Sequence, residues 1–369
     1  MRARGPAPTP LDVGFGVAQA GGTSEGTILY EAAAPAPASE QDQSAPAVPA
    51  DSQPAVRFQI LSLDGGGYRG IYSAAVLAAI EEDLGNPITQ YFDLITGTST
   101  GGIIAIGLGA GLRPREIVEF YARWGPVIFR KQPLRTAFGL WRRKYGSETR
   151  RSALTEVLGE RTMGDSASRL VIPAYDLGAD GVYVFKTPHH QRLKRDWKER
   201  LVDVAMATSA APTYFPAASL GGIRLVDGGV WANNPIVIGI AEAISMCGVP
   251  LESIRAFSLG TTSDVAHRHP RLDEGGLVQW ARAGIDVLLR GQSVGADGTA
   301  QHLLTPDRYL RHDPSVPEGV LKMDRCDTEA LIGLARTRSR ELMPFFNAKF
   351  ADHHAPAYQP LYARQGAMT

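Results

Sequence analysis

The chain has few cysteines, no net charge and no long apolar segment, and each absence excludes a class of protein. Only two of its 369 residues are cysteines, Cys247 and Cys326, which is too few for a disulfide framework or a cysteine-based metal cluster. The 38 Lys and Arg residues balance the 38 Asp and Glu residues, so no overall field favours a nucleic-acid duplex as partner. No apolar run reaches the roughly 18 residues of a spanning helix, and no apolar core follows the N-terminal arginines as in a signal peptide. We therefore expect a cytoplasmic protein.

Residues 1–56 form a leader rich in Ala, Pro, Gly, Ser and Gln, as in AAAPAPASEQDQSAPAVPADSQPA. Such a composition buries too little apolar surface to offset the entropy of ordering the chain. We predict that the leader is disordered and that residues 57–369 form the folded domain. Its last part, from about residue 275, has a helical pattern with one short strand at residues 309–312.

After Arg57, short apolar runs typical of strands alternate with segments of helical periodicity. The predicted strands are residues 58–63, 92–96, 169–175, 181–186, 223–226 and 254–259. The predicted helices are residues 71–84, 103–108, 114 to about 124, 201–211 and 241–246. This alternation predicts an α/β fold with a mainly parallel central sheet and helices on both of its faces.

A glycine-rich turn, Asp64-Gly65-Gly66-Gly67-Tyr68-Arg69-Gly70, ends the first predicted strand. Consecutive glycines let several backbone N–H groups point at one spot, and the helix that follows adds the positive end of its dipole. The turn therefore predicts a receptor for a developing oxyanion or for a phosphate.

The same turn fits the dinucleotide fingerprint G-x-G-x-x-G at Gly65, Gly67 and Gly70. That interpretation needs an acidic residue at the end of the second strand, about 20 residues further on. Asp83 lies near that distance but at the end of a predicted helix, so the context argues against a nucleotide cofactor. We expect no cofactor and no metal ion, because the sequence also holds no cluster of metal ligands.

A second turn, Gly97-Thr98-Ser99-Thr100-Gly101, lies between a predicted strand and a predicted helix. This is the context of a nucleophile elbow, in which Gly97 and Gly101 permit the sharp turn that exposes the hydroxyl of Ser99. The alternative is an ordinary turn that caps a helix. A strand before it and a helix after it favour the nucleophile.

A serine nucleophile needs a base, and a third turn, Asp227-Gly228-Gly229, offers one after the strand 223–226. Residues just past the carboxyl ends of parallel strands converge on one edge of a sheet, so we expect Ser99 and Asp227 to meet there. A histidine could instead complete a Ser-His-Asp triad. The candidates after Asp227 are His267, His269, His302 and His312, none of which follows a strand as a triad histidine usually does.

The combination of LSLDGGGYRG, GTSTGG and DGG in this order resembles the patatin-like phospholipases. Residues 207–216 (ATSAAPTYFP) and Asn233-Asn234-Pro235 are also similar, and the resemblance extends over about residues 57–315. It implies a three-layer α/β architecture and hydrolysis of fatty-acyl esters of phospholipids by a serine–aspartate dyad. By this resemblance Ser99 is the nucleophile and Asp227 the base, the amides of Gly65, Gly66 and Gly67 form the oxyanion hole, and Arg69 supports that loop.

Within the family, three segments resemble the bacterial anti-phage phospholipases that cyclic dinucleotides activate: residues 58–64, Gln292-Ser293 and Tyr309-Leu310-Arg311. Plant patatins share much of this pattern, and the leader and His312 depart from it. The resemblance implies a cytoplasmic enzyme that lies peripherally on the inner membrane when active. Two alternatives remain, a constitutive lipid acyl hydrolase without a nucleotide activator and a non-catalytic binding or storage protein that kept the fold.

Residues 128–151, IFRKQPLRTAFGLWRRKYGSETRR, combine eight Lys or Arg residues with one Glu and four interleaved aromatic residues. Such a segment suits a surface of anionic lipids, where each positive charge adds about 1 kcal/mol. It could equally bind an anionic activator such as a cyclic dinucleotide, or form a solvated helix and loop. The candidate contacts are Arg130, Lys131, Trp141, Arg142, Arg143 and Lys144.

Overall fold

The computed structural model describes residues 57–128, 147–264, 272–274, 276–316 and 327–363. The leader and the candidate contacts between Arg130 and Lys144 lie outside the described residues, so what the sequence predicts for them stays a prediction.

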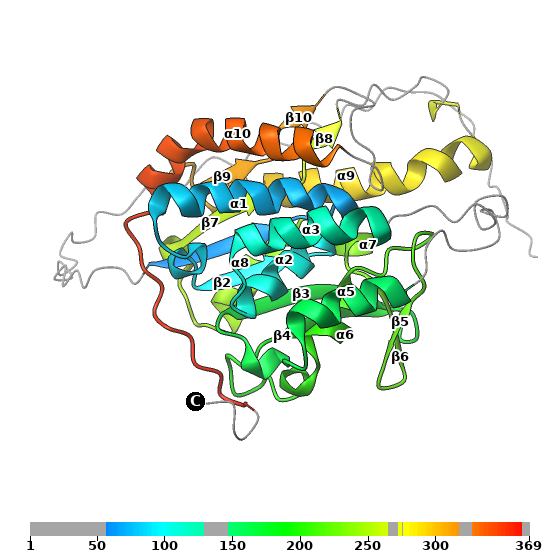
Figure 1. The fold of residues 1–369 in the computed structure, drawn as a ribbon, viewed down its shortest axis with the longest axis horizontal. Helices are drawn as coiled ribbons and strands as arrows, with labels where there is room; N and C mark the ends of the chain where they lie inside the picture. The colour runs from blue at the N-terminus through cyan, green and yellow to red at the C-terminus, as the bar shows by residue number, and fades with distance from the viewer. Residues whose placement is uncertain (1–56, 129–146, 265–271, 275, 317–326, 364–369) are drawn as a thin grey trace, which may run out of the picture. The chain divides into compact units, whose positions relative to one another are not determined.

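The centre of the domain is an eight-stranded sheet (Figure 1). Its strands are β1 (Phe58–Leu63), β2 (Leu94–Gly97), β3 (Arg169–Asp176), β4 (Gly181–Lys186), β5 (Ala218–Leu220), β6 (Ile223–Asp227), β7 (Ile254–Leu259) and β9 (Tyr309–His312). They lie in the order β5-β6-β3-β2-β1-β7-β9, and β4 pairs with β3. A separate two-stranded sheet joins β8 (Ser263–Asp264) to β10 (Ser315–Val316).

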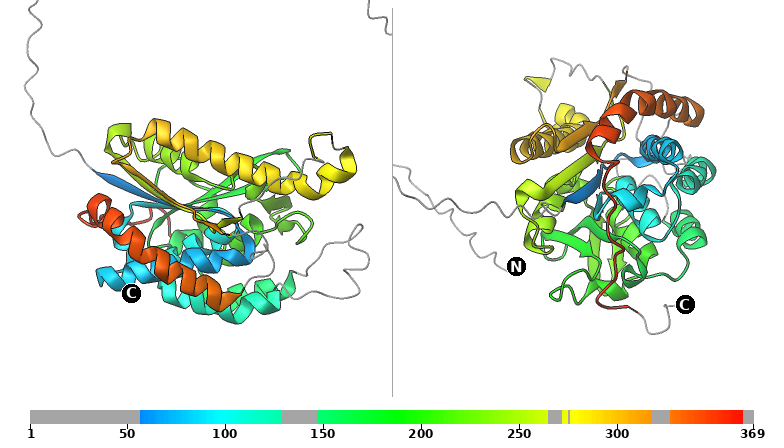
Figure 2. Two further views of the ribbon diagram at one scale, coloured as in Figure 1. Left: turned by 90° about the horizontal axis from the view of Figure 1, so that it is seen from above. Right: turned by 90° about the vertical axis from the view of Figure 1, so that its left-hand side faces the viewer.

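Helices cover both faces of the sheet, as the left view of Figure 2 shows. One layer consists of α1 (Gly70–Leu84), α2 (Thr100–Gly109), α3 (Pro114–Ile128), α5 (Glu148–Leu158), α6 (Leu201–Thr208) and α10 (Thr328–Lys349). The other consists of α7 (Gly229–Ala232), α8 (Ile236–Ser245) and α9 (Leu277–Leu303). Short 3-10 helices span Gly67–Arg69, Ile88–Tyr91, Met163–Asp165, Asp196–Lys198 and Leu251–Ser253.

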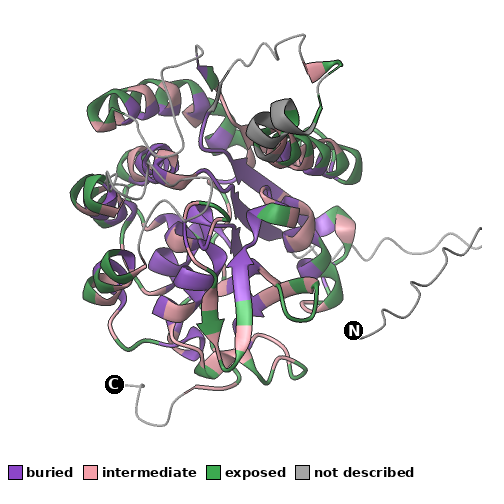
Figure 3. Ribbon diagram, turned by 90° about the vertical axis from the view of Figure 1, so that its right-hand side faces the viewer, coloured by how far each residue is buried: buried purple, intermediate pink, exposed green. Residues whose placement is uncertain are grey.

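Strand β1 shows why the fold has three layers. Its six residues are all buried, and successive side chains of a strand point to opposite faces. Phe58 and Ile60 pack in a core with residues of α8 and α9, whereas Leu61 and Leu63 pack in a second core with residues of the other helical layer. The buried strands at the centre of Figure 3 belong to both cores. The predicted α/β fold, a central sheet flanked by helices, is confirmed.

The path of β6 differs from the expectation and explains how the site forms. Strands β1, β2, β3, β7 and β9 pair in parallel, but β6 runs antiparallel to β3, with Asp227 opposite Ala174. The expectation that Asp227 ends a parallel strand is therefore wrong. Because β4 pairs with β3 along Val171–Asp176, β2 and β6 share the other edge of β3. They approach each other from opposite directions, and their carboxyl ends face each other near Pro173.

Several helix boundaries differ from the sequence prediction, and two of them lie near the candidate site. Helix α6 ends at Thr208 rather than at residue 211, because Pro212 disfavours helical geometry in the residue before it. The predicted helical segment 241–246 belongs to α8, which begins earlier, at Ile236, and ends at Ser245; Pro235 is tolerated at a helix start. The early end of α6 leaves Ser209–Ala211 as a turn beside the candidate site.

Candidate active site

Ser99 lies at a sharp turn between β2 and α2, where it is the N-cap residue of the helix. Its backbone has φ 55° and ψ −117°, a left-handed φ that costs a non-glycine residue about 1–3 kcal/mol. A Cβ atom on Gly97 would overlap the backbone of Gly101, and one on Gly101 would overlap the carbonyl of Leu63. The turn therefore requires glycine on both sides of the serine, as the elbow pattern predicts.

The side chain of Ser99 meets the side chain of Asp227. The Ser99 hydroxyl donates a hydrogen bond to Oδ2 of Asp227 at 2.6 Å, and the amide of Gly229 donates to Oδ1 at 2.7 Å. Burial raises the pKa of Asp227 to about 6, although these two hydrogen bonds and the charge of Arg150 act in the opposite direction. A carboxylate with that pKa is a better proton acceptor than an ordinary aspartate.

The turn at the end of α6, which begins at Thr208, holds both of these residues in place. The Thr208 hydroxyl accepts a hydrogen bond from the amide of Ser99 at 3.0 Å and donates one to the carbonyl of Pro173 at 2.6 Å. Two residues further on, the carbonyl of Ala210 accepts the amide of Asp227 at 3.1 Å. The sequence offered a signal for this turn only in the segment ATSAAPTYFP, whose residues had no assigned role.

The glycine-rich turn lies beside Ser99, but its amides are not equivalent. The amide of Gly65, expected as an oxyanion donor, donates to the carbonyl of Asn233 at 2.9 Å, which argues against that role. Within the described residues, the amides of Gly66 and Gly67 donate to no other group. Gly67 has φ 61°, a left-handed conformation that favours glycine. The side chain of Arg69 donates to the carbonyl of Gly66 at 3.4 Å. This contact is long, but it joins Arg69 to the loop that Arg69 is expected to support.

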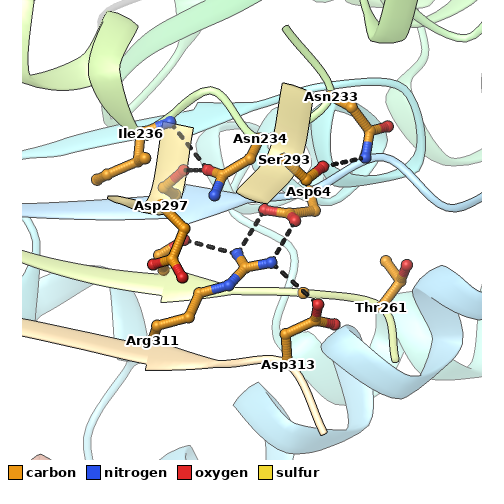
Figure 4. Close-up of polar contacts among 12 residues, drawn as sticks. Asp64, Asn233, Asn234, Ile236, Thr261, Ser293, Asp297, Arg311 and Asp313 are labelled. Atoms are coloured by element: carbon orange, nitrogen blue, oxygen red, sulfur yellow. Dashed lines mark hydrogen bonds and ion pairs between the residues drawn. The ribbon is translucent and has the colours of Figure 1, made fainter. Parts of the chain in front are cut away.

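A buried ion pair anchors the start of this turn (Figure 4). Arg311 on β9 binds both carboxylate oxygens of Asp64, at 2.8 and 2.6 Å, and also contacts Asp313 at 3.2 Å. Burial lowers the pKa of Arg311, but the charge and hydrogen bonds of Asp64, together with the charge of Asp313, raise it above its usual value. The guanidinium therefore stays charged and fixes the residue that precedes Gly65.

Helix α9 anchors the turn that follows Asp227. The side chain of Asn233 donates to the Ser293 hydroxyl at 2.8 Å, and the amide of Asn234 donates to the Gln292 side chain at 2.9 Å. Figure 4 shows Asn233, Ser293 and Asp64 around the same loop. The glycine-rich turn, the turn that carries Asp227 and α9 are thus connected through one pair of asparagines.

A pocket opens beside Ser99 and Gly67 between α2, α3, α5 and the segment after α6. Its apolar walls include Ile103, Phe120, Ile128, Leu154, Ala211 and Phe215. Arg150 is also part of the wall. Walls of this kind suit an apolar group bound beside Ser99.

The histidine alternative finds no support among the described residues. His312 bonds the hydroxyl of Tyr72 at 2.7 Å, and burial lowers its pKa to about 4. No histidine in the described ranges hydrogen-bonds to Ser99 or Asp227, while His267 and His269 lie outside them. Nor do the described residues gather three or more His, Cys, Asp or Glu side chains as a metal site. No helix in the described ranges is long and apolar enough to cross a membrane.

A serine at a strand-to-helix turn of an α/β sheet, hydrogen-bonded to a buried carboxylate, is an arrangement typical of hydrolases. Residues 61–240 match the patatin-like phospholipase family. The chain is 34% identical over 265 residues to a cGAMP-activated phospholipase of Pseudomonas aeruginosa, which covers 71% of this chain and 80% of that protein. It is 31% identical over 321 residues to a cGAMP-activated phospholipase of Vibrio cholerae, covering 78% and 90%. The chain belongs to the patatin-like phospholipase family.

The solved structure of VipD from Legionella pneumophila aligns with a TM-score of 0.45 at 10% identity, covering 78% of this chain and 67% of that one.

Proposed function

We propose that this protein hydrolyses fatty-acyl esters of membrane phospholipids, with Ser99 as nucleophile and Asp227 as base. The observation that carries the proposal is the 2.6 Å hydrogen bond between them, at a strained elbow beside an apolar pocket. Both residues are buried, at 9% and 4% exposure, so water competes little for the bond. The family membership supports a hydrolase, and the geometry supports the assignment of these two residues.

The reaction proceeds in two acyl-transfer steps. Asp227 takes the proton of Ser99 as Oγ attacks the ester carbonyl, and the amides of Gly66 and Gly67 stabilise the oxyanion. The intermediate expels the lyso-lipid alkoxide, to which Asp227 returns the proton, and leaves an acyl ester on Ser99. A water molecule then gives a proton to Asp227 while it attacks this ester, and the fatty acid leaves as Ser99 regains its proton.

We also propose that a cyclic dinucleotide activates the enzyme in anti-phage defence, and that it acts peripherally on the inner membrane. Two relatives that match most of this chain are named cGAMP-activated phospholipases. The basic and aromatic residues between Arg130 and Lys144 are the candidate contacts for the activator or for anionic lipid.

The test measures fatty-acid release from phospholipid vesicles by the wild type, Ser99→Ala and Asp227→Asn, with and without a panel of cyclic dinucleotides. Release that appears with one nucleotide and is lost in both variants supports the whole proposal. Release without nucleotide keeps the hydrolase and removes the activator. A folded wild type that releases no fatty acid under any condition would overturn the proposal and favour the non-catalytic alternative.

A further inference from the structure

Arg150 differs from the surface arginines around it in sequence. It belongs to the basic segment that the sequence suggested for contact with lipid or activator. In the structure it is only 3% exposed and forms part of the pocket wall beside Ser99. Its neighbour Arg151 instead pairs with Asp203 at 2.6 Å, with a side chain that is 43% exposed.

The guanidinium of Arg150 caps the carboxyl end of α6 by hydrogen bonds. Its Nη1 donates to the carbonyl of Ser209 and to the Ser209 hydroxyl at 3.1 Å, and its Nη2 approaches the carbonyl of Met206 at 3.4 Å. The last carbonyls of a helix lack partners within the helix and carry its negative dipole end. A cation at this place therefore stabilises the turn that follows Thr208. The guanidinium also lies 4.1 Å from the ring centre of Phe215, in a cation–π contact.

Within the part of the chain that the structure describes, no ion pair neutralises the charge of Arg150. No carboxylate of the described residues lies within ion-pair distance of it, and its buried Nε atom has no hydrogen-bond partner. A buried charge without a paired counter-ion is costly. Burial accordingly lowers the pKa of Arg150 to about 10, while the charge of Asp227 opposes this effect. Groups whose pKa values are perturbed in this way cluster at functional sites.

We propose that Arg150 is a positioning residue for the Ser99–Asp227 dyad, which it serves by holding the Thr208–Ala211 turn and by favouring the ionised form of Asp227. The inference rests on the proposed function of that dyad. The turn is the common support, because Thr208 binds the amide of Ser99 and Ala210 binds the amide of Asp227. A displacement of this turn therefore moves nucleophile and base together.

Few groups besides Arg150 act on Asp227. The others are the Ser99 hydroxyl, from the start of α2, and the Gly229 amide, from α7. On Arg150 itself, the charges that act are those of Asp227 and Arg151. Burial has the largest effect on the pKa of Asp227, and loss of Arg150 also alters the turn. A shift in the titration of Asp227 that Arg150→Met shows and Arg150→Lys does not can be assigned to the Arg150 charge, because both variants change the hydrogen bonds to the turn.

The experiment measures the rate at which a water-soluble fluorophosphonate labels Ser99 between pH 5 and pH 9. Labelling joins Oγ to phosphorus, expels fluoride and passes the hydroxyl proton to Asp227, so it reports on the dyad without a lipid surface. The variants are Arg150→Met and Arg150→Lys. The control is Arg123→Met, which removes an exposed arginine that links α3 to α5 through Glu156.

We expect Arg150→Met to label at least about tenfold more slowly at pH 7, with the acid limb of the rate profile moved to higher pH. Arg150→Lys should keep the position of the acid limb but still label slowly, because a lysine retains the charge and loses the fork. Arg123→Met should behave as the wild type. An unmoved limb in Arg150→Met, or equal limbs and rates in all three variants, would overturn the proposal.

A second pair of variants decides the matter if Arg150→Met fails to fold. Thr208→Val removes the acceptor for the Ser99 amide, whereas Thr208→Ser keeps it. We expect the valine variant to label slowly with an unchanged acid limb and the serine variant to label nearly as the wild type. Equal rates in both would sink the role of the turn. If the folded wild type is not labelled at Ser99, the proposed function fails rather than the role of Arg150.

Discussion

The backbone amide of Gly65 donates a hydrogen bond to the backbone carbonyl of Asn233 at 2.9 Å. This bond joins the glycine-rich turn to the segment that follows Asp227. The Asn233 side chain is held in turn by Ser293 on α9. The loop that carries the proposed oxyanion donors and the turn that carries the base are therefore fixed to each other, and a change on one side should be felt on the other.

A methyl group on Gly65 provides the first prediction. The Cβ atom of Gly65→Ala would overlap Oδ1 of Asn233 and lie 3.4 Å from the Cβ of Ser99. We expect the ester hydrolysis rate to fall by roughly 10²–10³-fold, as when an oxyanion donor is lost. In an Asn233→Ala background the overlap disappears, so the same substitution should cost less than about tenfold. An equal loss in both backgrounds, measured as kcat on a soluble ester, would contradict this steric account.

The three chemical turns could be predicted from sequence because each is local. The residues of each pattern stand within a few positions of one another, although Gly101 and Gly228 also make room for the distant carbonyls of Leu63 and Pro173. The direction of β6 could not be predicted, because the pairing of a strand depends on partners far away in the chain. The hydrogen bond from the Gly65 amide to Asn233 could not be predicted for a related reason, since Asn233 lies far away in the chain.

The burial of Arg150 and Arg311 could not be predicted from the composition of the sequence around them. Arg150 lies in a run of basic residues that resembles a solvated surface, yet it is buried against α6. Arg311 stands 247 positions from Asp64, with which it forms the buried pair. Charge patterns indicate exposure only on average, and the partner that makes burial tolerable is supplied by the tertiary fold.

The pH dependence of the reaction should follow Asp227. Its pKa in the fold is about 6, and a general base must be deprotonated to act, so kcat/KM should fall about tenfold per unit below that pH. A profile that stays flat down to pH 5 would argue against Asp227 as the base.

The folding stability should depend on pH in the opposite sense to the rate, because the contribution of Asp227 to it is larger at low pH. Because folding raises the pKa of Asp227 from 3.8, its contribution to stability is fully present below about pH 4 and is lost as pH rises through about 6. Asp227→Asn removes a buried charge, so its stability relative to the wild type should be greater at pH 8 than at pH 4. Urea unfolding at the two pH values measures this difference, and a constant difference would contradict it.

The buried pair of Asp64 and Arg311 should matter for both stability and rate. Arg311→Met leaves the Asp64 carboxylate buried without its partner, which typically costs about 3–5 kcal/mol of unfolding free energy. It should also slow hydrolysis, because Asp64 precedes the glycine turn. The double variant Asp64→Asn with Arg311→Met should recover much of the stability. Arg338→Met, at an exposed pair with Glu341, should cost less than about 1 kcal/mol, and urea unfolding of the four proteins provides the comparison.

The last prediction follows from the backbone conformation of Ser99: the two inactive variants Ser99→Ala and Ser99→Gly should differ in folding stability. Ser99 has φ 55°, which glycine adopts freely and alanine does not. Ser99→Ala and Ser99→Gly should both abolish fatty-acid release, but the glycine variant should be more stable to urea by about 1 kcal/mol. Ser152, an exposed residue within α5, gives the matched control with the opposite sign, because alanine is favoured over glycine there by about 1 kcal/mol. If Ser99→Ala proves as stable as Ser99→Gly while Ser152 behaves as expected, the elbow stores no strain at the nucleophile.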